Sequence, residues 1–333
     1  MTEFVARRLG ADGPRVFPLA LGCMGMSGMY GESDDAESVR TIHAAVEGGV
    51  TLLDTGDFYG MGHNELVVRR ALSEMSGAAR GKVLLSVKFG ALRSPNGVWN
   101  GFDGRPAAVK NFLAYSLNRL GVDHIDIYRP ARLDGAVPIE ETVGAIAEMV
   151  TAGYVRHIGL SEVGLDTVRR AKTVAPICDV QLEYGLASRG LEESILFGLR
   201  ELGVGVTAYG VLSRGLLSGS TPTGKGDFRA FLPRFTGDNF TKNQTLVAAL
   251  GELAAARGVS AVQMAIAWVL ARGEDIVPVI GSRKVAQVRE ALGALAVRLS
   301  AEEIAKLETA VPAAEIAGTR YDKHQMAMLD SEK

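Results

Sequence analysis

Short apolar runs rich in β-branched residues recur along this chain, and stretches with helical periodicity separate most of them. Runs of this length and composition are typical of buried strands. Strands that alternate with helices predict the α/β class, and eight of them predict a parallel sheet closed into a (β/α)8 TIM barrel. The eight predicted strands are Leu19–Leu21, Thr51–Asp54, Val83–Lys88, Ile125–Tyr128, Tyr154–Leu160, Ile177–Gln181, Val204–Ala208 and Ile276–Ile280.

The predicted helices carry residues that favour helix ends. Ser33-Asp34-Asp35 precedes one helix, Pro106 opens another, and Ser260 leads into a helix over 261–272. Several helices run into glycine, as at Gly121 and Gly153, and glycine is the residue most favoured just after a helix. The predicted boundaries of strands and helices are therefore mutually consistent.

Three segments lie outside this alternation. Residues 4–9 and 15–17 flank Gly10-Ala11-Asp12-Gly13-Pro14, which predicts an N-terminal β-hairpin that caps the bottom of the barrel. The long polar stretch Gly210–Asn239 follows the seventh strand, and we interpret it as a cofactor or substrate lid, because long loops in compact domains are often functional. The segment Gly318–Lys333 either covers the active site or contacts a neighbouring subunit, and its sequence does not decide between the two.

Composition changes this picture little. The chain has 333 residues, 47% of them hydrophobic, which fits one barrel domain over residues 1–333. A formal net charge of −2 argues against nucleic acid or an anionic membrane as a partner. Cys23 and Cys178 offer neither a disulfide framework nor metal-ligand spacing, and no apolar run reaches the roughly 20 residues of a membrane span. We therefore expect a cytoplasmic protein without a metal site, with a small-molecule substrate and an oligomeric state left open.

Polar residues at predicted strand ends are the first candidates for catalysis, because barrel active sites lie where the strands end. Asp54 ends the second strand, Lys88 ends the third, and Tyr59 lies in the loop after Asp54. An ammonium paired with a carboxylate lowers the pKa of a nearby phenol, which would make Tyr59 a usable proton donor for carbonyl reduction. From the residues alone, an ion pair that seals the barrel end, beside an unrelated tyrosine, is the more common explanation of a lone Lys/Asp pair.

The sequence around these residues resembles a known family. Thr51-Leu52-Leu53-Asp54-Thr55-Gly56-Asp57-Phe58-Tyr59-Gly60, followed by Asn64-Glu65 and the strand of Lys88, resembles the aldo-keto reductase signature over nearly the whole chain. The resemblance implies that Tyr59, Lys88 and Asp54 are three members of the family's catalytic tetrad. The fourth is usually a histidine, and Ala131 stands at its position. A water, a hydroxyl of the substrate, or a non-reducing role could account for this departure.

A nicotinamide cofactor would be held without a Rossmann motif, since none follows a strand. Barrels often bind phosphate with the loops after strands seven and eight. The resemblance implies that Tyr209 stacks on the nicotinamide, that Ser161 and Gln181 hold its amide, and that Ser282 with Arg283 holds a 2′-phosphate, which favours NADPH. The expected cofactor residues are Gly22, Met24, Asp54, Ser161, Glu162, Gln181, Tyr209, Gly210, Val211, Leu212, Ser213, Arg214, Gly215, Gly281, Ser282, Arg283, Gln287 and Glu290.

Apolar residues in loops at the barrel mouth suit an aldehyde or ketone with an aromatic or aliphatic body. The wording of the tyrosine motif and the replacement of the histidine also resemble pyridoxal reductases within this family. The expected substrate pocket draws on Met24, Met29, Tyr30, Phe58, Phe89, Trp99 and Ala131.

Three functions compete at this stage. The leading hypothesis is NADPH-dependent reduction of an aldehyde or ketone, pyridoxal among them, with the proton from Tyr59. The second is a non-redox barrel enzyme, such as an aldolase that forms a Schiff base at Lys88. The third is a nucleotide-binding regulatory module with weak or vestigial reductase activity, as in some potassium-channel β subunits that share this fold.

Overall fold

Eight parallel strands close into a barrel in the computed structural model, which describes residues 4–224 and 226–333. The strands follow one another around the barrel in chain order, and the last pairs with the first through Val279 and Ala20. All eight predicted strands are confirmed, and each extends one or two residues further at its carboxyl end. The barrel strands are β3 (Ala20–Gly22), β4 (Leu52–Gly56), β5 (Leu84–Phe89), β8 (Ile125–Pro130), β9 (Val155–Ser161), β10 (Ile177–Glu183), β11 (Gly205–Tyr209) and β12 (Ile276–Gly281).

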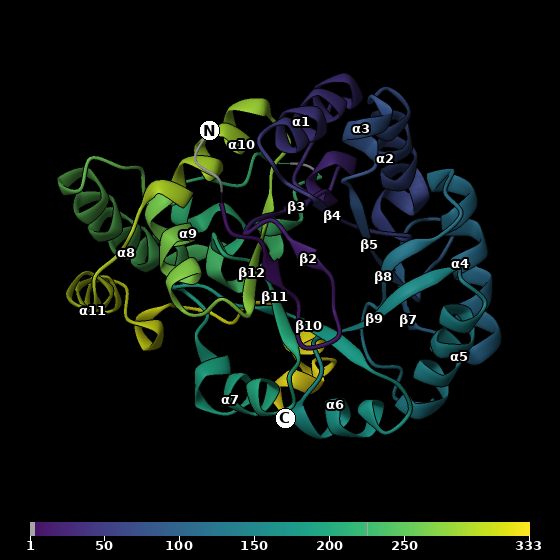
Figure 1. Cartoon of the computed structure of the whole chain (residues 1–333). Helices are drawn as coiled ribbons and strands as arrows, with labels where there is room; N and C mark the ends of the chain where they lie inside the picture. Colours follow the sequence, from purple (N-terminus) through teal and green to yellow (C-terminus); the bar gives the residue numbers. More distant parts are fainter. Residues whose placement is uncertain (1–3, 225) are drawn as a thin grey trace.

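Helices form a ring around the barrel, as Figure 1 shows. Their ends follow the predicted chemistry: the Asp34 carboxylate accepts the amide of Glu37, Pro106 opens its helix, and Ser260 forms a capping box with Gln263. The helices are α1 (Asp35–Glu47), α2 (His63–Ser73), α3 (Gly77–Arg80), α4 (Pro106–Leu120), α5 (Ile139–Thr151), α6 (Leu165–Lys172), α7 (Ile195–Glu201), α8 (Gly237–Ala256), α9 (Ala261–Ala271), α10 (Val285–Gly293), α11 (Ala301–Ala310) and α12 (Lys323–Ala327).

Within residues 4–224 and 226–333, no single helix is long and apolar enough to cross a bilayer. Helices α8 and α9 reach the required length and hydropathy only as a pair bent by 87°.

The predicted N-terminal hairpin is present and closes the amino-terminal end of the barrel (Figure 1). It consists of β1 (Arg7–Arg8) and β2 (Arg15–Val16), paired antiparallel. The Arg7 guanidinium donates to the carbonyls of Leu270, Gly273 and Ile276, at 2.9, 2.9 and 2.5 Å, and so ties the hairpin to the segment around β12. The hairpin therefore acts as a plug, which leaves the other end of the barrel for function.

A buried ion pair lies inside the barrel. The Arg129 guanidinium, with no exposed surface, donates to the carboxylate of Asp179 at 2.9 Å and to Ser86 Oγ at 3.2 Å. Gly159 makes room for it, because a Cβ there would lie 3.0 Å from Arg129 Cζ and 2.7 Å from Asp179 Oδ1. A buried charge is tolerated only when it is paired and hydrogen-bonded, and this pair satisfies that condition across β8 and β10.

The stretch Gly210–Asn239 is more ordered than its polar composition predicted. It holds three short 3-10 helices, Ser213–Ser218, Phe228–Phe231 and Pro233–Phe235, and α8 already begins at Gly237. The Arg229 guanidinium donates to both carboxylate oxygens of Asp227, at 2.9 and 2.6 Å, and to Ser220 Oγ at 3.0 Å. The polar side chains therefore satisfy one another, which polar composition alone does not reveal.

Candidate active site

Three of the predicted side chains meet at the carboxyl end of β4 and β5. Lys88 forms an ion pair with Asp54 inside the barrel mouth. The other oxygen of Asp54 accepts hydrogen bonds from Ser86 Oγ at 2.8 Å and from Gln181 Nε2 at 2.9 Å. With these partners around it, Asp54 holds the Lys88 ammonium in one place.

Tyr59 reaches this cluster from the loop after β4. The backbone amide of Asp57 donates to the carbonyl of Lys88 at 2.9 Å, which holds the loop against β5. Lys88 Nζ lies 5.2 Å from the centre of the Tyr59 ring. Among the hydrogen bonds of residues 4–224 and 226–333, none involves the Tyr59 hydroxyl, and Lys88 donates to Asp54 instead. Tyr59, Lys88 and Asp54 thus form one cluster, as the sequence predicts.

The electrostatics of Tyr59 differ from the expectation. Burial raises the pKa of Tyr59 well above its usual value, and the neighbouring Asp54 and Tyr30 add to this, while Arg132 acts in the opposite direction. Burial also lowers the pKa of Lys88 against the opposing effect of Asp54. For Asp54, Lys88 and Arg129 outweigh burial and hold its pKa below the usual range. The predicted lowering of the Tyr59 pKa by Lys88 is therefore not found, because Asp54 takes up the ammonium.

Ala131 directly follows β8, beside the end of β5. Its amide donates to the carbonyl of Phe89 at 2.8 Å, and its side chain is buried. The next residue, Arg132, turns its guanidinium back so that Nη1 donates to the Ala131 carbonyl at 2.7 Å. The position that carries histidine in the family pattern is thus filled by a methyl group with a guanidinium beside it.

The expected nicotinamide residues lie at the carboxyl ends of neighbouring strands. Ser161 pairs with Gln181 across β9 and β10, and Tyr209 ends β11. Glu162 follows with a left-handed φ of 53° and accepts the amide of Glu183 on Oε1 at 3.1 Å. These residues face the same end of the barrel as Asp54, to which Gln181 donates.

The loop after β11 has an unusual backbone. Ser213, Arg214 and Gly215 all have positive φ, at 46°, 56° and 91°. Positive φ in two consecutive non-glycine residues costs energy and persists only where the surrounding structure holds it. Arg214 Nη2 also donates to the Glu183 carboxylate at 2.8 Å, which fixes this turn at the mouth. The turn consists of Tyr209, Gly210, Val211, Leu212, Ser213, Arg214 and Gly215.

The loop after β12 closes the ring next to β3. Gly281 pairs with Gly22, which in turn pairs with Asp54, so this loop lies at the mouth as predicted. The Ser282 hydroxyl is buried and has no hydrogen-bond partner among the described residues. Arg283 Nη1 donates to the carbonyls of Tyr30 and Glu32, at 2.9 and 3.1 Å. The Ser282 hydroxyl therefore keeps an unused hydrogen-bonding capacity, and Arg283 contacts the loop after β3.

The remaining adenosine-side residues lie on α10, and Met24 opens the 3-10 helix after β3. Gln287 Oε1 accepts the amide of Arg283 at 3.0 Å, and the carbonyl of Glu290 accepts a hydrogen bond from Gln263 at 3.2 Å. Met24 lies in the helix Met24–Ser27, next to the strand end at Gly22. Gln287 therefore shapes the turn that presents Arg283, whereas Glu290 contacts Gln263 through its backbone carbonyl.

Several residues of the predicted substrate pocket lie near Tyr59 or in the loops beside it. Phe58 stacks edge-on against Tyr59 at 4.8 Å and against Trp99 at 5.5 Å. Trp99 comes from an added hairpin, β6 (Ala91–Arg93) with β7 (Trp99–Phe102), which the sequence analysis did not predict. Across the mouth, Tyr30 forms a bridge with Asp227, and the carbonyl of Met29 accepts the amide of Phe228 at 3.3 Å, so the loop after β11 contacts the loop after β3.

Phe89 was wrongly placed in the pocket. Its ring is fully buried and stacks on Tyr128 at 4.2 Å in the core between the barrel and its helices. Successive side chains of a strand point to opposite faces. Since Lys88 points into the barrel, Phe89 points out of it.

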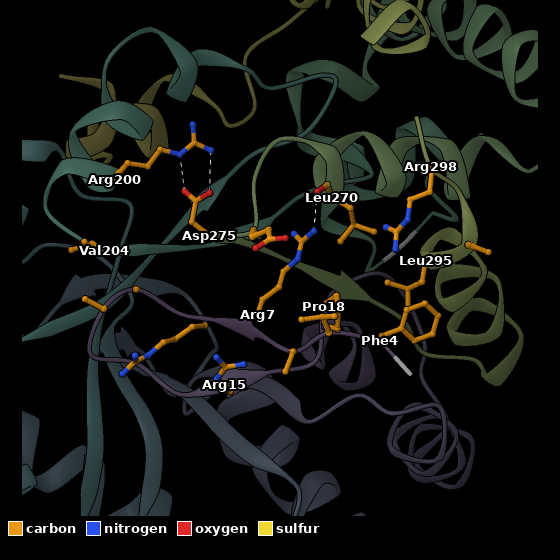
Figure 2. Close-up of a pocket in the computed structure, with 18 residues that line it drawn as sticks. Phe4, Arg7, Arg15, Pro18, Arg200, Val204, Leu270, Asp275, Leu295 and Arg298 are labelled. Carbon is orange, nitrogen blue, oxygen red and sulfur yellow. Dashed lines mark hydrogen bonds and ion pairs between the residues drawn. The ribbon is translucent and has the colours of Figure 1, made fainter. Parts of the chain in front are cut away.

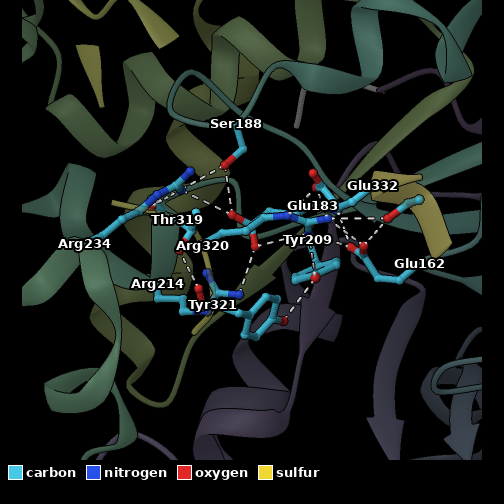
Figure 3. Close-up of polar contacts among 12 residues, drawn as sticks. Glu162, Glu183, Ser188, Tyr209, Arg214, Arg234, Thr319, Arg320, Tyr321 and Glu332 are labelled. Atoms are coloured by element: carbon cyan, nitrogen blue, oxygen red, sulfur yellow. Dashed lines mark hydrogen bonds and ion pairs between the residues drawn. The ribbon is translucent and has the colours of Figure 1, made fainter. Parts of the chain in front are cut away.

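The C-terminal segment covers the mouth of its own barrel, which answers the question its sequence left open (Figure 3). Arg320 donates to both oxygens of Glu162 at 2.9 and 2.7 Å, and to Glu332 at 2.6 Å. The Tyr321 hydroxyl lies 3.1 Å from that of Tyr209. The segment is therefore part of the site.

Sequence reasoning missed most of the charged network beneath this segment. Glu183 accepts from Arg214 at 2.8 Å and from Arg234 at 3.3 Å, and the Arg214 guanidinium lies 4.4 Å from the centre of the Tyr321 ring (Figure 3). The available signal was the carboxylate of Glu162 at the end of a predicted strand. A buried carboxylate needs a cation or hydrogen-bond donors to compensate for its lost hydration, and Arg320 provides them.

A pocket of about 910 Å³ opens at the opposite end of the barrel, between the hairpin and β12 (Figure 2). Arg7 in this pocket is committed to backbone carbonyls, and Arg200 pairs with Asp275 at 2.8 Å. None of the expected catalytic or cofactor residues lines it. The chemistry-bearing residues are instead gathered at the carboxyl ends of the strands.

Comparisons with known proteins agree with this geometry. The family model described as the aldo/keto reductase family matches residues 18–312. The chain belongs to the aldo-keto reductase family. A curated relative of this aldo-keto reductase, the probable aldo-keto reductase 1 of Glycine max, is 38% identical over 320 residues, which is 94% of this chain and 91% of the relative.

Two solved structures show the same architecture. The glycerol dehydrogenase AKR11B4 of Gluconobacter oxydans is 30% identical, with a TM-score of 0.82 over 94% of this chain and 97% of the other. The holo form of the aldo-keto reductase AKR11C1 of Bacillus halodurans is 27% identical, with a TM-score of 0.77 over 97% and 100%. This aldo-keto reductase is thus a (β/α)8 barrel and a nicotinamide-dependent oxidoreductase of its family.

Proposed function

We propose that this aldo-keto reductase reduces aldehydes or ketones to alcohols with NADPH, and that Tyr59 is the proton donor. The observation that carries the proposal is the meeting of Tyr59 with the Asp54–Lys88 pair at the same barrel end as the two candidate phosphate loops. When bound, the cofactor supplies a hydride to the carbonyl carbon. Tyr59 gives its hydroxyl proton to the carbonyl oxygen and regains one from water.

The raised pKa of Tyr59 is compatible with this role. It keeps the proton on the phenol near neutral pH until negative charge develops on the carbonyl oxygen. An alkoxide is a stronger base than a phenolate, so the transfer is favourable once the hydride has moved. Arg132, which opposes the rise in the Tyr59 pKa, then favours the phenolate that remains.

The preference for NADPH rests on the loop after β12. Ser282 offers a buried hydroxyl, and Arg283 has donors beyond the nitrogen that binds Tyr30 and Glu32. Both are suited to a 2′-phosphate, which NADH lacks. Ser161 and Gln181 would hold the nicotinamide amide, Tyr209 would stack on its ring, and the turn at Ser213–Gly215 would receive the pyrophosphate.

The substrate pocket favours a carbonyl compound with an aromatic or aliphatic body, because Phe58 and Trp99 form an aromatic wall beside Tyr59. Pyridoxal belongs to this class, and we propose it as the first substrate to test. The thiols of Cys23 and Cys178 are unpaired and buried, which fits the expected cytoplasmic location, still a prediction.

A regulatory, nucleotide-binding role is the second candidate. It is favoured by Ala131, which leaves the family's tetrad without its histidine. Such a module would bind NADPH tightly and reduce carbonyls slowly or not at all.

The test follows NADPH absorbance with the purified protein and pyridoxal, an aromatic aldehyde or a simple ketone, beside NADH. Cofactor binding is measured separately by protein fluorescence. We expect turnover with at least one carbonyl and a lower KM for NADPH than for NADH. NADPH binding without turnover on any of the three would move the function to the regulatory module, and no binding of either nucleotide would contradict both.

A further inference from the structure

Ala131, at the histidine position of the family pattern, has no side-chain donor for the reacting oxygen. A carbonyl oxygen that receives a hydride at its carbon develops negative charge, and sites for such reactions stabilise it with more than one donor. Tyr59 provides one. Ala131, fixed beside β5 through its amide bond to Phe89, has no donor in its side chain.

A guanidinium reaches this place from the next residue. Arg132 Nη1 donates to the Ala131 carbonyl at 2.7 Å, which folds the side chain back along the strand end. Its Nη2 donates to the Tyr321 hydroxyl at 3.3 Å, and that hydroxyl lies 3.1 Å from the Tyr209 hydroxyl. The Tyr321 hydroxyl therefore links Arg132, which follows the histidine position, to the tyrosine expected to stack on the nicotinamide.

Arg132 differs from the other arginines of the mouth in its charge partners. Arg214 and Arg234 share the carboxylate of Glu183, and Arg320 pairs with Glu162. Arg132 has no carboxylate at ion-pair distance among residues 4–224 and 226–333, and its hydrogen bonds go to a carbonyl and a phenol. A half-buried cation without an anion is suited to a group whose negative charge appears only during reaction.

Arg132 acts to lower the pKa of two neighbouring phenols, Tyr59 and Tyr321. Arg132 opposes the burial that raises the pKa of Tyr59, so it lies within electrostatic reach of the proton donor. Burial alone would raise the pKa of Tyr321, but Arg214 and Arg132 outweigh it and hold that pKa below the usual value. A phenol made more acidic by two guanidiniums is a stronger hydrogen-bond donor.

We propose that Arg132, with Tyr321 of the C-terminal segment, provides the second donor to the reacting oxygen in place of the family's histidine. The inference rests on the reductase function proposed above. The carbonyl carbon gains a hydride from the reduced nicotinamide, the oxygen gains its proton from Tyr59, and Arg132 stabilises the charge between these events without itself losing a proton. Arg132 is then a catalytic residue, and Tyr321 contributes as donor and as the group that positions it.

The experiment compares Arg132→Met and Tyr321→Phe with the full-length parent on benzaldehyde and 4-carboxybenzaldehyde. Removal of one donor of this kind typically lowers kcat about 100-fold or more. We expect a loss of that size for Arg132→Met in kcat on both aldehydes, with a smaller change in KM, and a smaller loss for Tyr321→Phe. Adding guanidinium ion should restore part of the activity of Arg132→Met.

A second pair of variants separates catalysis from structure. In Arg132→Met, the further change Ala131→His returns a donor to the family's position and should recover part of kcat, which a merely structural arginine would not allow. In the reverse direction, alcohol oxidation needs Tyr59 as phenolate, so the pH limb of this reaction should move to higher pH in Arg132→Met. The matched control is Arg170→Met, which removes an exposed arginine paired with Glu140.

Several results would overturn the inference. An unchanged kcat in Arg132→Met, with Tyr59→Phe inactive, would reject Arg132 while leaving the reductase function intact. A loss confined to KM for the carboxylated aldehyde would make Arg132 an anion-binding group for the substrate instead. A parent enzyme without turnover on any carbonyl would reject the reductase function and this inference together.

Discussion

Arg320 of the C-terminal segment and Glu162 at the end of β9 form a two-point ion pair, with N···O distances of 2.9 and 2.7 Å. Neither side chain is appreciably exposed. The two residues are 158 positions apart in the chain, so this contact exists only in the folded protein. It holds Tyr321 over the barrel mouth and makes the C-terminal segment part of the active site.

The ion pair predicts a specific loss of stability in acid. Burial would raise the pKa of Glu162, but Arg320 outweighs it and lowers the value from 4.5 to about 2. A carboxyl whose pKa is depressed by folding stabilises the protein above its unfolded pKa, and this stabilisation disappears as pH falls from about 4.5 towards 2. The contribution is on the order of 3 kcal/mol.

This prediction is checked by urea unfolding of the parent and Glu162→Gln between pH 3 and 7, with Glu302→Gln as an exposed control. The stability difference between parent and Glu162→Gln should be largest near neutral pH and should shrink in acid. A difference that stays constant over this range would contradict the assigned ion pair.

Asp57, in the loop that carries Tyr59, predicts the opposite pH dependence. Its carboxylate oxygens have no hydrogen-bond partner among the described residues. Burial, with Glu65 nearby, raises its pKa from 3.8 to about 8. A raised carboxyl pKa means that stability present below about 3.8 is lost as pH rises through about 8.

Asp57→Asn should therefore stabilise the protein at and above neutral pH by at least about 1 kcal/mol, the scale of an unsatisfied buried group. Thermal unfolding at pH 4, 6 and 9 is the measurement. The melting temperatures of parent and variant should be close at pH 4 and separate as pH rises. A variant that is less stable than the parent at pH 9 would show that the carboxylate is needed as such.

Secondary structure was predictable because it depends on local pattern. The strands that end at Asp54 and Lys88 were visible as apolar runs, and Asp34 and Ser260 mark helix starts by chemistry that acts over three residues. Tyr59, Asp54 and Lys88 could be brought together because parallel strands place their carboxyl ends on one side.

What local pattern could not show were the partners supplied by distant segments. Arg320 and Tyr321 lie in a polar stretch without periodicity, and only the fold brings them to Glu162 and Tyr209. Phe89 was predicted wrongly in the pocket. Successive side chains of a strand point to opposite faces, so Phe89 points away from the side of β5 that carries Lys88. Arg132 was not predicted as a site residue, because the sequence pattern pointed only to the missing histidine at Ala131.

The buried ion pair in the barrel interior predicts that substitutions of Arg129 and Asp179 have non-additive effects on the free energy of unfolding. Replacing Arg129 by Met leaves the Asp179 carboxylate buried without its cation, which should cost about 3–5 kcal/mol. The double variant Arg129→Met with Asp179→Leu should recover most of that loss, because it removes the uncompensated charge. Urea unfolding of the single and double variants measures this, with the exposed Arg70→Met as control. A double variant less stable than Arg129→Met would contradict the assignment.

The loop after β12 predicts the cofactor preference. Arg283→Met should raise the KM for NADPH by about 10-fold or more, the scale of a lost hydrogen bond to a charged group, and should change the KM for NADH little. Initial rates with both cofactors give this ratio. An equal rise for NADPH and NADH would instead assign Arg283 to holding the loop of Tyr30 and Glu32, to whose carbonyls it donates.

The central claim is that Tyr59 gives the proton to the reacting oxygen. It is tested most directly by single-turnover reduction of an accepted carbonyl in Tyr59→Phe, with NADPH binding measured in the same sample. We predict that binding is retained while the rate of NADPH oxidation falls about 100- to 10,000-fold, the range for loss of a general acid. A Tyr59→Phe variant that binds NADPH and turns over at the parent rate would contradict the account.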